Sequence, residues 1–171
     1  MHSIEISAGV IDYHETGAGP PVVLLHGLLM DHTLWDRVLP LLPAGFRYIR
    51  PVLPLGAHRR AMNPGADLTL PGQVRLVADL LDALALENVT LVHSDWGGAL
   101  VLWSPDNKVM PPQHGRRLAA LIPRARYAEI PGAYVLSMLD EPEAVAQEMG
   151  AFLTSAENAR YYVRSPEYRK T

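Results

Sequence analysis

The sequence predicts an α/β fold, a mainly parallel sheet flanked by helices on both faces. Two observations carry this prediction. Short β-rich runs alternate with helical patterns along the chain, and one early run is apolar on both faces, as a central strand of a parallel sheet is. No repeat or linker divides the sequence, so we predict a single domain over residues 1–171 with about six or seven strands. Residues 154–171 either extend the last helix or fray.

The chain opens with two runs, SIEIS and VIDYHETG, in which polar and apolar residues alternate. Alternation of this kind is typical of strands with one solvated face, so these runs predict a hairpin. The next run, PPVVLLHG, is different because its four central residues, Val22, Val23, Leu24 and Leu25, are all apolar. It predicts a central strand that is buried on both sides.

Two helices and a strand are predicted next. DHTLWDRVLPLLP places apolar residues at helical spacing, with Asp31 or Thr33 as a cap and Pro43 as the end. FRYIRPVLP predicts a strand that prolines end. LTLPGQVRLVADLLDALAL is the clearest amphipathic helix. We expect its buried stripe to consist of Val74, Val77, Leu81 and Leu84, with Arg75, Asp79 and Asp82 off it.

The second half continues the alternation. VTLVHS and LVLWS predict strands, PPQHGRRLAALIP a helix, and ARYAEIPG a further strand. DEPEAVAQEMGAFL predicts the last helix, with Asp140 as its cap and Pro142 in its first turn. Val145, Met149 and Phe152 share one face of that helix.

Composition limits the function. A net charge of −3, from 15 basic and 18 acidic residues, gives no reason to expect nucleic acid or an anionic membrane as partner. With no cysteine, a disulfide framework, a thiolate zinc site and a cysteine nucleophile are excluded, which fits the cytoplasm. The N-terminal residues do not read as a signal peptide, and the longest apolar stretch falls short of the ~20 residues of a spanning helix.

The first chemical motif is HGLLMD, in which a buried strand ends at His26-Gly27 and the chain turns. The turn presents backbone N–H groups, that of Leu28 especially, toward whatever lies above the sheet. Fixed donors of this kind can stabilise a developing anion. His26 has two interpretations, a member of that pocket or a hydrogen-bonded structural residue.

The second motif is SDWGGA, which matches a nucleophile elbow. Such a turn needs small residues around the attacking side chain because it leaves little room for its neighbours. The glycines stand two and three places after the nucleophile. Counting back from Gly97 and Gly98, that position is Asp95 and not Ser94.

With the runs over residues 100–123 and 129–153, these motifs resemble the α/β-hydrolase superfamily, particularly members with an aspartate nucleophile such as haloalkane dehalogenases and epoxide hydrolases. The resemblance covers about residues 4 to 153 and implies a reduced α/β-hydrolase fold without a cap domain. It implies that Asp95 attacks an electrophilic carbon and that the N–H groups of Leu28 and Trp96 form an oxyanion hole beside His26 and Gly27. Trp96 either holds a leaving halide or fills space. The resemblance implies a small-molecule substrate and no metal or cofactor.

The sequence departs from that family at several positions. The family acid falls on Asn107, with Asp106 one place off, and the catalytic histidine falls on Val135. Leu29 replaces the proline of epoxide hydrolases, and Leu28 lacks the side-chain N–H of a second halide donor. His93 stands where the family has glycine and faces the same side of the sheet as Asp95 by strand alternation. His93 is therefore a candidate substitute base. His58 and His114 have no motif support.

Only residues 96–99 separate Asp95 from the strand that begins at Leu100, whereas a parallel crossover needs a dozen or more. The family normally has a helix, a strand, a second helix and the cap here. Three outcomes are open: an antiparallel hairpin through DWGG, a short helix over WGGALVLW, or a sheet completed by a second copy in a homodimer. We favour a retained parent fold with local rearrangement.

The sequence therefore predicts a hydrolase that uses Asp95 against a small apolar electrophile such as an ester, an epoxide or an alkyl halide. Turnover is expected to be impaired because no histidine stands at the family position. The alternative is an inactive relic, or a module derived by internal deletion that binds a small molecule or a protein.

Overall fold

The computed structural model describes residues 1–93, 100–121 and 125–155. The strands in these ranges are β1 (His2–Ile6), β2 (Gly9–Gly17), β3 (Pro21–Leu25), β4 (Arg47–Pro51), β5 (Thr90–His93), β6 (Leu100–Trp103) and β7 (Arg126–Glu129). The helices are α1 (Leu70–Ala83), α2 (Pro112–Leu121), α3 (Ser137–Asp140) and α4 (Pro142–Thr154), with 3₁₀ segments η1 (His32–Trp35) and η2 (Leu39–Leu41). Within the described ranges no helix has the length and apolar character needed to cross a bilayer.

Five strands form one sheet in the order β1-β2-β4-β3-β5. The opening hairpin is confirmed, since β1 and β2 pair antiparallel with Ile4 opposite Ile11. β3 runs parallel to β4 on one side and to β5 on the other. The prediction of a central buried strand is confirmed as well, because Val22, Val23 and Leu24 of β3 are inaccessible to solvent.

β6 and β7 form a separate parallel pair in which Val101 lies opposite Tyr127, with α2 as the crossover between them. A single sheet was expected, and the strands instead divide into two. The hairpin through DWGG is wrong because, among the described strands, β5 pairs with β3 and β6 pairs with β7. A helix over WGGALVLW is also wrong, since its second half, Leu100–Trp103, is a strand.

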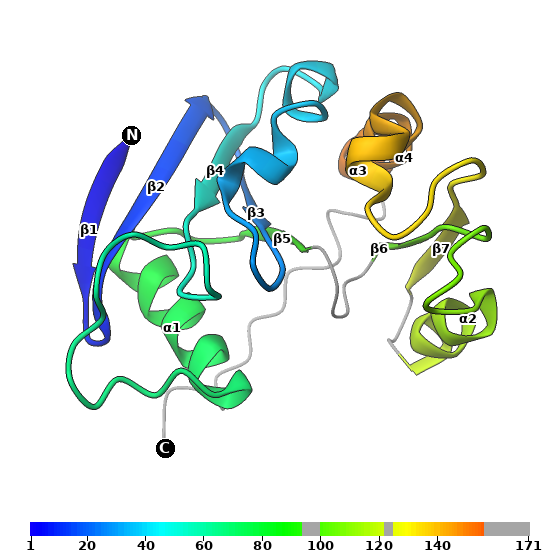
Figure 1. Ribbon diagram of the computed structural model, residues 1–171. Helices are drawn as coiled ribbons and strands as arrows, with labels where there is room; N and C mark the ends of the chain where they lie inside the picture. The colour runs from blue at the N-terminus through cyan, green and yellow to red at the C-terminus, as the bar shows by residue number, and fades with distance from the viewer. Residues whose placement is uncertain (94–99, 122–124, 156–171) are drawn as a thin grey trace.

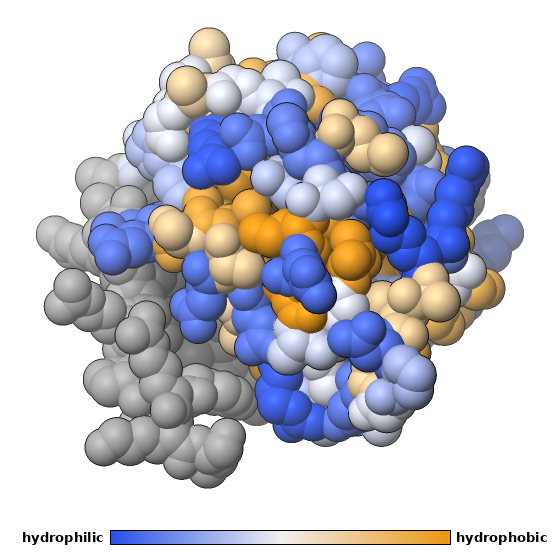
Figure 2. Space-filling view, turned by 90° about the vertical axis from the view of Figure 1, so that its left-hand side faces the viewer, coloured by the Kyte–Doolittle hydropathy of each residue, from blue (hydrophilic) through white to orange (hydrophobic). Residues whose placement is uncertain are grey.

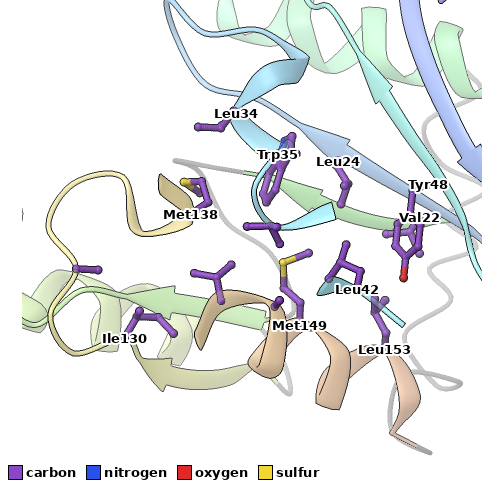
Figure 3. Close-up of a cluster of buried hydrophobic side chains, with 14 residues drawn as sticks. Val22, Leu24, Leu34, Trp35, Leu42, Tyr48, Ile130, Met138, Met149 and Leu153 are labelled. Carbon is purple, nitrogen blue, oxygen red and sulfur yellow. The ribbon is translucent and has the colours of Figure 1, made fainter. Parts of the chain in front are cut away.

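One core joins the two sheets. Figure 1 shows α1 and α2 below the sheets, with the 3₁₀ segments, α3 and α4 above them. Between the strands and the layer of η1, η2, α3 and α4, Trp35 and Leu24 face Met149 of α4 (Figure 3). Ile130, which follows β7, lies at the other end of this core. Burial of these apolar side chains is the main force that holds the β6–β7 pair to the larger sheet.

The helix predicted over residues 31–43 is replaced by η1 and η2. Pro40 lies inside η2 and lacks the N–H that a continuous α-helix requires, which explains the break. Asp31 caps η1 as predicted, and its carboxylate accepts from the Thr33 N–H. Trp35 and Val38 are buried, so the apolar pattern was read correctly although the helix type was not.

α1 forms as predicted but with its face rotated. The buried side chains are Gln73, Leu76 and Leu80, whereas Val74 is 50% exposed. Leu76 and Leu80 pack with Ile6 of β1 in a second core cluster, and Val77 and Leu84 of the predicted stripe pack against its edge. The expected stripe is therefore wrong at Val74.

The start of α4 also differs from the prediction. Asp140 is the last residue of α3 and its carboxylate accepts from the Tyr134 N–H, so it does not cap α4. The N-cap is Glu141, whose side chain makes no capping hydrogen bond. Pro142 in the first turn is confirmed, and so is the shared buried face of Val145, Met149 and Phe152.

Candidate functional site

Of the predicted site residues that the structure describes, His26, Gly27, Leu28 and His93 lie at one edge of the five-stranded sheet. β3, β4 and β5 are parallel, and Leu25 at the end of β3 pairs with His93 at the end of β5. The segments that follow these strands therefore leave the sheet at the same edge. Ligand sites of open α/β sheets lie beyond the carboxyl ends of the strands, which makes this edge the place to look.

His26 is the first residue beyond β3 and is almost fully buried. Its Nε2 atom accepts a 2.8 Å hydrogen bond from the Leu53 N–H, and its Nδ1 atom lies 2.9 Å from the Gly27 carbonyl oxygen. Since Nε2 accepts, Nδ1 must carry the proton and donate. Burial lowers the pKa of His26, which favours this neutral form. The imidazole ties the segment after β3 to the segment after β4.

The turn after His26 exposes the predicted anion donor. The Met30 N–H donates to the Gly27 carbonyl at 3.3 Å, and the Leu29 N–H donates to the Leu55 carbonyl at 2.8 Å. The Leu28 N–H has no acceptor in the part of the chain that the structure describes. The Leu28 side chain is 64% exposed. This backbone donor is free to meet a ligand.

A cavity of about 310 Å³ opens beside this turn. Its walls come from the segment after β3, from the segment after β4 and from the region of α3, and they consist of Leu29, Met30, Asp31, Thr33, Leu34, Ala57, Leu136 and Leu139. Most of these side chains are apolar. A volume of this size holds a small organic molecule.

The polar part of the wall is Asp31 with Thr33. The Asp31 Oδ1 atom accepts from the Thr33 N–H at 2.9 Å and from the Thr33 hydroxyl at 2.6 Å. These hydrogen bonds, that of the hydroxyl first, lower the pKa of Asp31. The carboxylate is therefore charged at neutral pH.

Behind η1 lies a group of charged and titratable side chains. The rings of His14 and His32 stack with their centroids 3.9 Å apart and their planes within 9°. Arg50, which is buried, donates to the Asp36 carboxylate and to the His32 carbonyl. Burial lowers the pKa of His14, and the neighbouring His32 lowers it further. These contacts hold η1, and with it one wall of the cavity, against β2 and β4.

The segments after β6 and β7 meet at Asp106, whose carboxylate accepts from the Gly132 N–H at 3.1 Å. Asn107 instead turns back on its own loop and accepts from the Val109 and Met110 N–H groups. Val135 is 52% exposed. Asp106 therefore stabilises the loop on which the family histidine would stand.

The central residues of the second motif lie outside the described ranges: Ser94, Asp95, Trp96, Gly97 and Gly98. His93 is half-buried at the end of β5. His114 is exposed on α2, and His58 follows β4 on the wall of a separate water-sized cavity. The structure thus places the turn His26–Leu28 and His93 at the same edge of the sheet.

Sequence reasoning missed two parts of this site. Leu136 and Leu139 line the cavity although nothing in their local pattern marks them as wall residues. The His14–His32 stack joins β2 to η1 and is equally invisible in a linear pattern. No cluster of three or more His, Cys, Asp or Glu residues suited to a metal occurs within the described ranges.

Comparison with known proteins gives the fold a context. A family model described as alpha/beta hydrolase fold matches residues 20–105. A haloalkane dehalogenase from Agrobacterium fabrum is 36% identical over 94 residues, which are 54% of this chain and 30% of that protein. A 2-hydroxy-6-oxo-2,4-heptadienoate hydrolase from Pseudomonas putida is 36% identical over 91 residues, which are 52% of this chain and 33% of that protein. The chain thus spans about a third of the length of these two relatives.

Among solved structures, a thermophilic esterase from Thermogutta terrifontis matches with a TM-score of 0.73. The match covers 89% of this chain and 97% of that one at 18% identity. At this identity the likeness concerns the fold alone. The predicted α/β fold with a mainly parallel sheet and flanking helices is confirmed.

Proposed function

Because this chain belongs to the alpha/beta hydrolase fold family, we propose that it acts on a small apolar electrophile through Asp95. The substrate is an ester, an epoxide or an alkyl halide. We propose further that the chain belongs to the aspartate-nucleophile branch of the family and to its members without a cap. The proposed reaction uses no metal and no organic cofactor.

The observation that carries the proposal is the apolar cavity at the edge where β3 and β5 end. β5 ends at His93, two residues before Asp95, directly beside the strand that leads into the Gly27–Leu28 turn. Six residues, 94–99, then connect β5 to β6. In the proposed arrangement Asp95 stands over this edge and reaches the cavity from the side of β5.

The proposed reaction with an alkyl halide has two steps. One carboxylate oxygen of Asp95 attacks the carbon, so that a C–O bond forms, the carbon–halogen bond breaks and halide leaves with the electron pair. Water then attacks the carbonyl carbon of the ester and releases the alcohol and a proton. The Leu28 N–H is the proposed donor to the oxyanion of this second step.

We propose that the second step, hydrolysis of the ester, is impaired in this chain. This step needs a base to activate water. Val135 stands where the family histidine would be, and the Asp106 carboxylate accepts from the Gly132 N–H instead of from an imidazole. His93 is the proposed substitute. If it does not serve, the ester on Asp95 persists.

The lack of a histidine at position 135, where Val135 stands, also favours a second function. A chain that has lost the base but keeps a cavity of about 310 Å³ can bind a small molecule without turning it over. The competing proposal is therefore an inactive, binding relic of a hydrolase. We further propose that the protein is cytoplasmic. We also propose that a second copy of the chain completes the sheet at its edge strand β5, which gives a homodimer.

Intact mass and product release separate these functions. The protein is incubated with 1-bromohexane and with 4-nitrophenyl butyrate, alongside Asp95→Asn and Ser94→Ala. Product at many equivalents supports the enzyme. A single stable adduct that Asp95→Asn removes and Ser94→Ala keeps supports a stalled nucleophile. Neither product nor adduct supports the relic and rejects the role of Asp95.

A further inference from the structure

The cavity beside η1 has a mostly apolar wall that contains one charged side chain. Of its eight described wall residues, six are apolar and one is a threonine, which leaves Asp31 as the single ionisable side chain among them. Figure 2, which views the molecule from the side of β1, shows apolar residues gathered on that face with hydrophilic residues around them. A single charge in an apolar wall affects which ligands bind there, to a degree that its exposure to water limits.

The geometry keeps Asp31 ionised. Its Oδ1 atom accepts both Thr33 hydrogen bonds, and its Oδ2 atom accepts none from any residue that the structure describes. The lowered pKa agrees with this arrangement. One carboxylate oxygen is thus left over for a ligand, and it carries negative charge.

Among the described residues, no arginine or lysine forms an ion pair with Asp31. Arg50 is bound to Asp36, and Arg37 donates to the Leu139 carbonyl. The His32 Nδ1 atom lies 3.9 Å from Asp31 Oδ1, but it is charged only when protonated. Neither arginine belongs to the described wall of the cavity.

We propose that Asp31 makes the cavity favour neutral and cationic organic ligands over carboxylates. This inference deepens the proposed function, on which it rests for the identity of the ligand as substrate. It assigns neutral or amine-bearing electrophiles to this chain and predicts weaker binding of substrates that carry a carboxylate. Asp31 is then a specificity-determining residue that takes no part in bond making.

The size of the effect follows from the partial exposure of Asp31. Its side chain is 33% exposed, so water screens the charge and a deep-interior Coulomb energy does not apply. We expect roughly a three- to tenfold difference in dissociation constant between a neutral ligand and an anionic ligand of the same length. The difference should shrink when salt is raised from 20 to 500 mM, as the screening length falls.

The test measures binding and needs no turnover. Hexanoate, hexanamide and hexylammonium are titrated at pH 8 into the wild-type chain, Asp31→Asn and Asp82→Asn, and dissociation constants are read by NMR. Asparagine also caps helices, so Asp31→Asn removes charge and keeps η1. Asp82 is exposed on α1, and its variant makes the same change in net charge far from the cavity wall.

The expected result is weakest binding for hexanoate in the wild type and in Asp82→Asn, with equal binding of hexanoate and hexanamide in Asp31→Asn. The proposal fails if hexanoate binds the wild type as well as hexanamide does, if Asp31→Asn keeps the difference, or if no ligand binds. Ala57→Phe should weaken all three ligands by filling the cavity, which locates the binding. Adduct formation at Asp95 is a separate readout, so either proposal can fail alone.

Discussion

The Leu53 N–H donates a 2.8 Å hydrogen bond to the Nε2 atom of His26, and this contact joins the two segments that frame the candidate site. Both residues are buried. The hydrogen bond settles the tautomer of His26 and gives its ring a structural partner on each nitrogen. These two hydrogen bonds of His26 therefore fix the turn that presents the Leu28 N–H.

His26→Ala is expected to destabilise the protein by about 2–4 kcal/mol, because it leaves the buried Leu53 N–H without a partner and creates a cavity. Urea unfolding measures this free energy. His114→Ala, on the exposed face of α2, is the matched control and should change it by less than about 0.5 kcal/mol. A His26→Ala variant as stable as the control would show that the contact does not hold the site together.

Stability should fall as the pH is lowered from 8 to 5.5. The pKa values of His26 and His14 are lowered in the folded chain, chiefly by burial. The unfolded chain therefore binds more protons below its ordinary histidine pKa of about 6.5. The stability is present in full above that value and is lost as the pH falls through the lower folded values.

The lowered pKa values of Asp12, Glu15 and Asp31 act in a more acidic window, since carboxyl groups titrate near pH 4 when unfolded. Urea unfolding at pH 5.5, 6.5 and 8 isolates the histidines. His14→Phe keeps a flat ring on His32 and should flatten the pH dependence, whereas His114→Gln should not. An unchanged slope in His14→Phe would remove His14 from the explanation.

Gly72→Ala should destabilise the protein by about 1–3 kcal/mol, although alanine favours helices. A Cβ atom at Gly72 would lie 1.9 Å from the carbonyl oxygen of Asp67, so the start of α1 must move. Gly150→Ala in α4 is the matched control, because its Cβ would meet only Pro43 side-chain atoms at 3.3 and 3.4 Å. Thermal unfolding of both variants checks the difference; equal melting temperatures would contradict the contact.

Local patterns predicted much of the fold. Alternation predicted the β1–β2 hairpin, and continuous apolar character predicted β3, because each pattern depends on neighbouring residues alone. The face of α1 was not predictable in full. Its sequence holds two overlapping apolar stripes, one through Val74 and one through Leu76 and Leu80, and the close approach of Gly72 to Asp67 favours the second.

The site was predictable only where it is local. The turn at His26–Leu28 could be read from the sequence, since a glycine follows a buried strand. The wall formed by Leu136 and Leu139 could not, because it lies more than 100 residues from Met30 along the chain and meets it only through tertiary packing. The same holds for the hydrogen bond between His26 and Leu53.

The central claim is that the carboxylate of Asp95 is the reactive group beside the cavity. Peptide-level mass spectrometry after incubation with 1-bromohexane in ¹⁸O-labelled water tests it most directly. The account predicts a hexyl group or an ¹⁸O atom on the peptide at Asp95, and neither in Asp95→Asn. An unmodified Asp95 peptide after long incubation, or a hexyl group on Ser94 instead, would contradict the account.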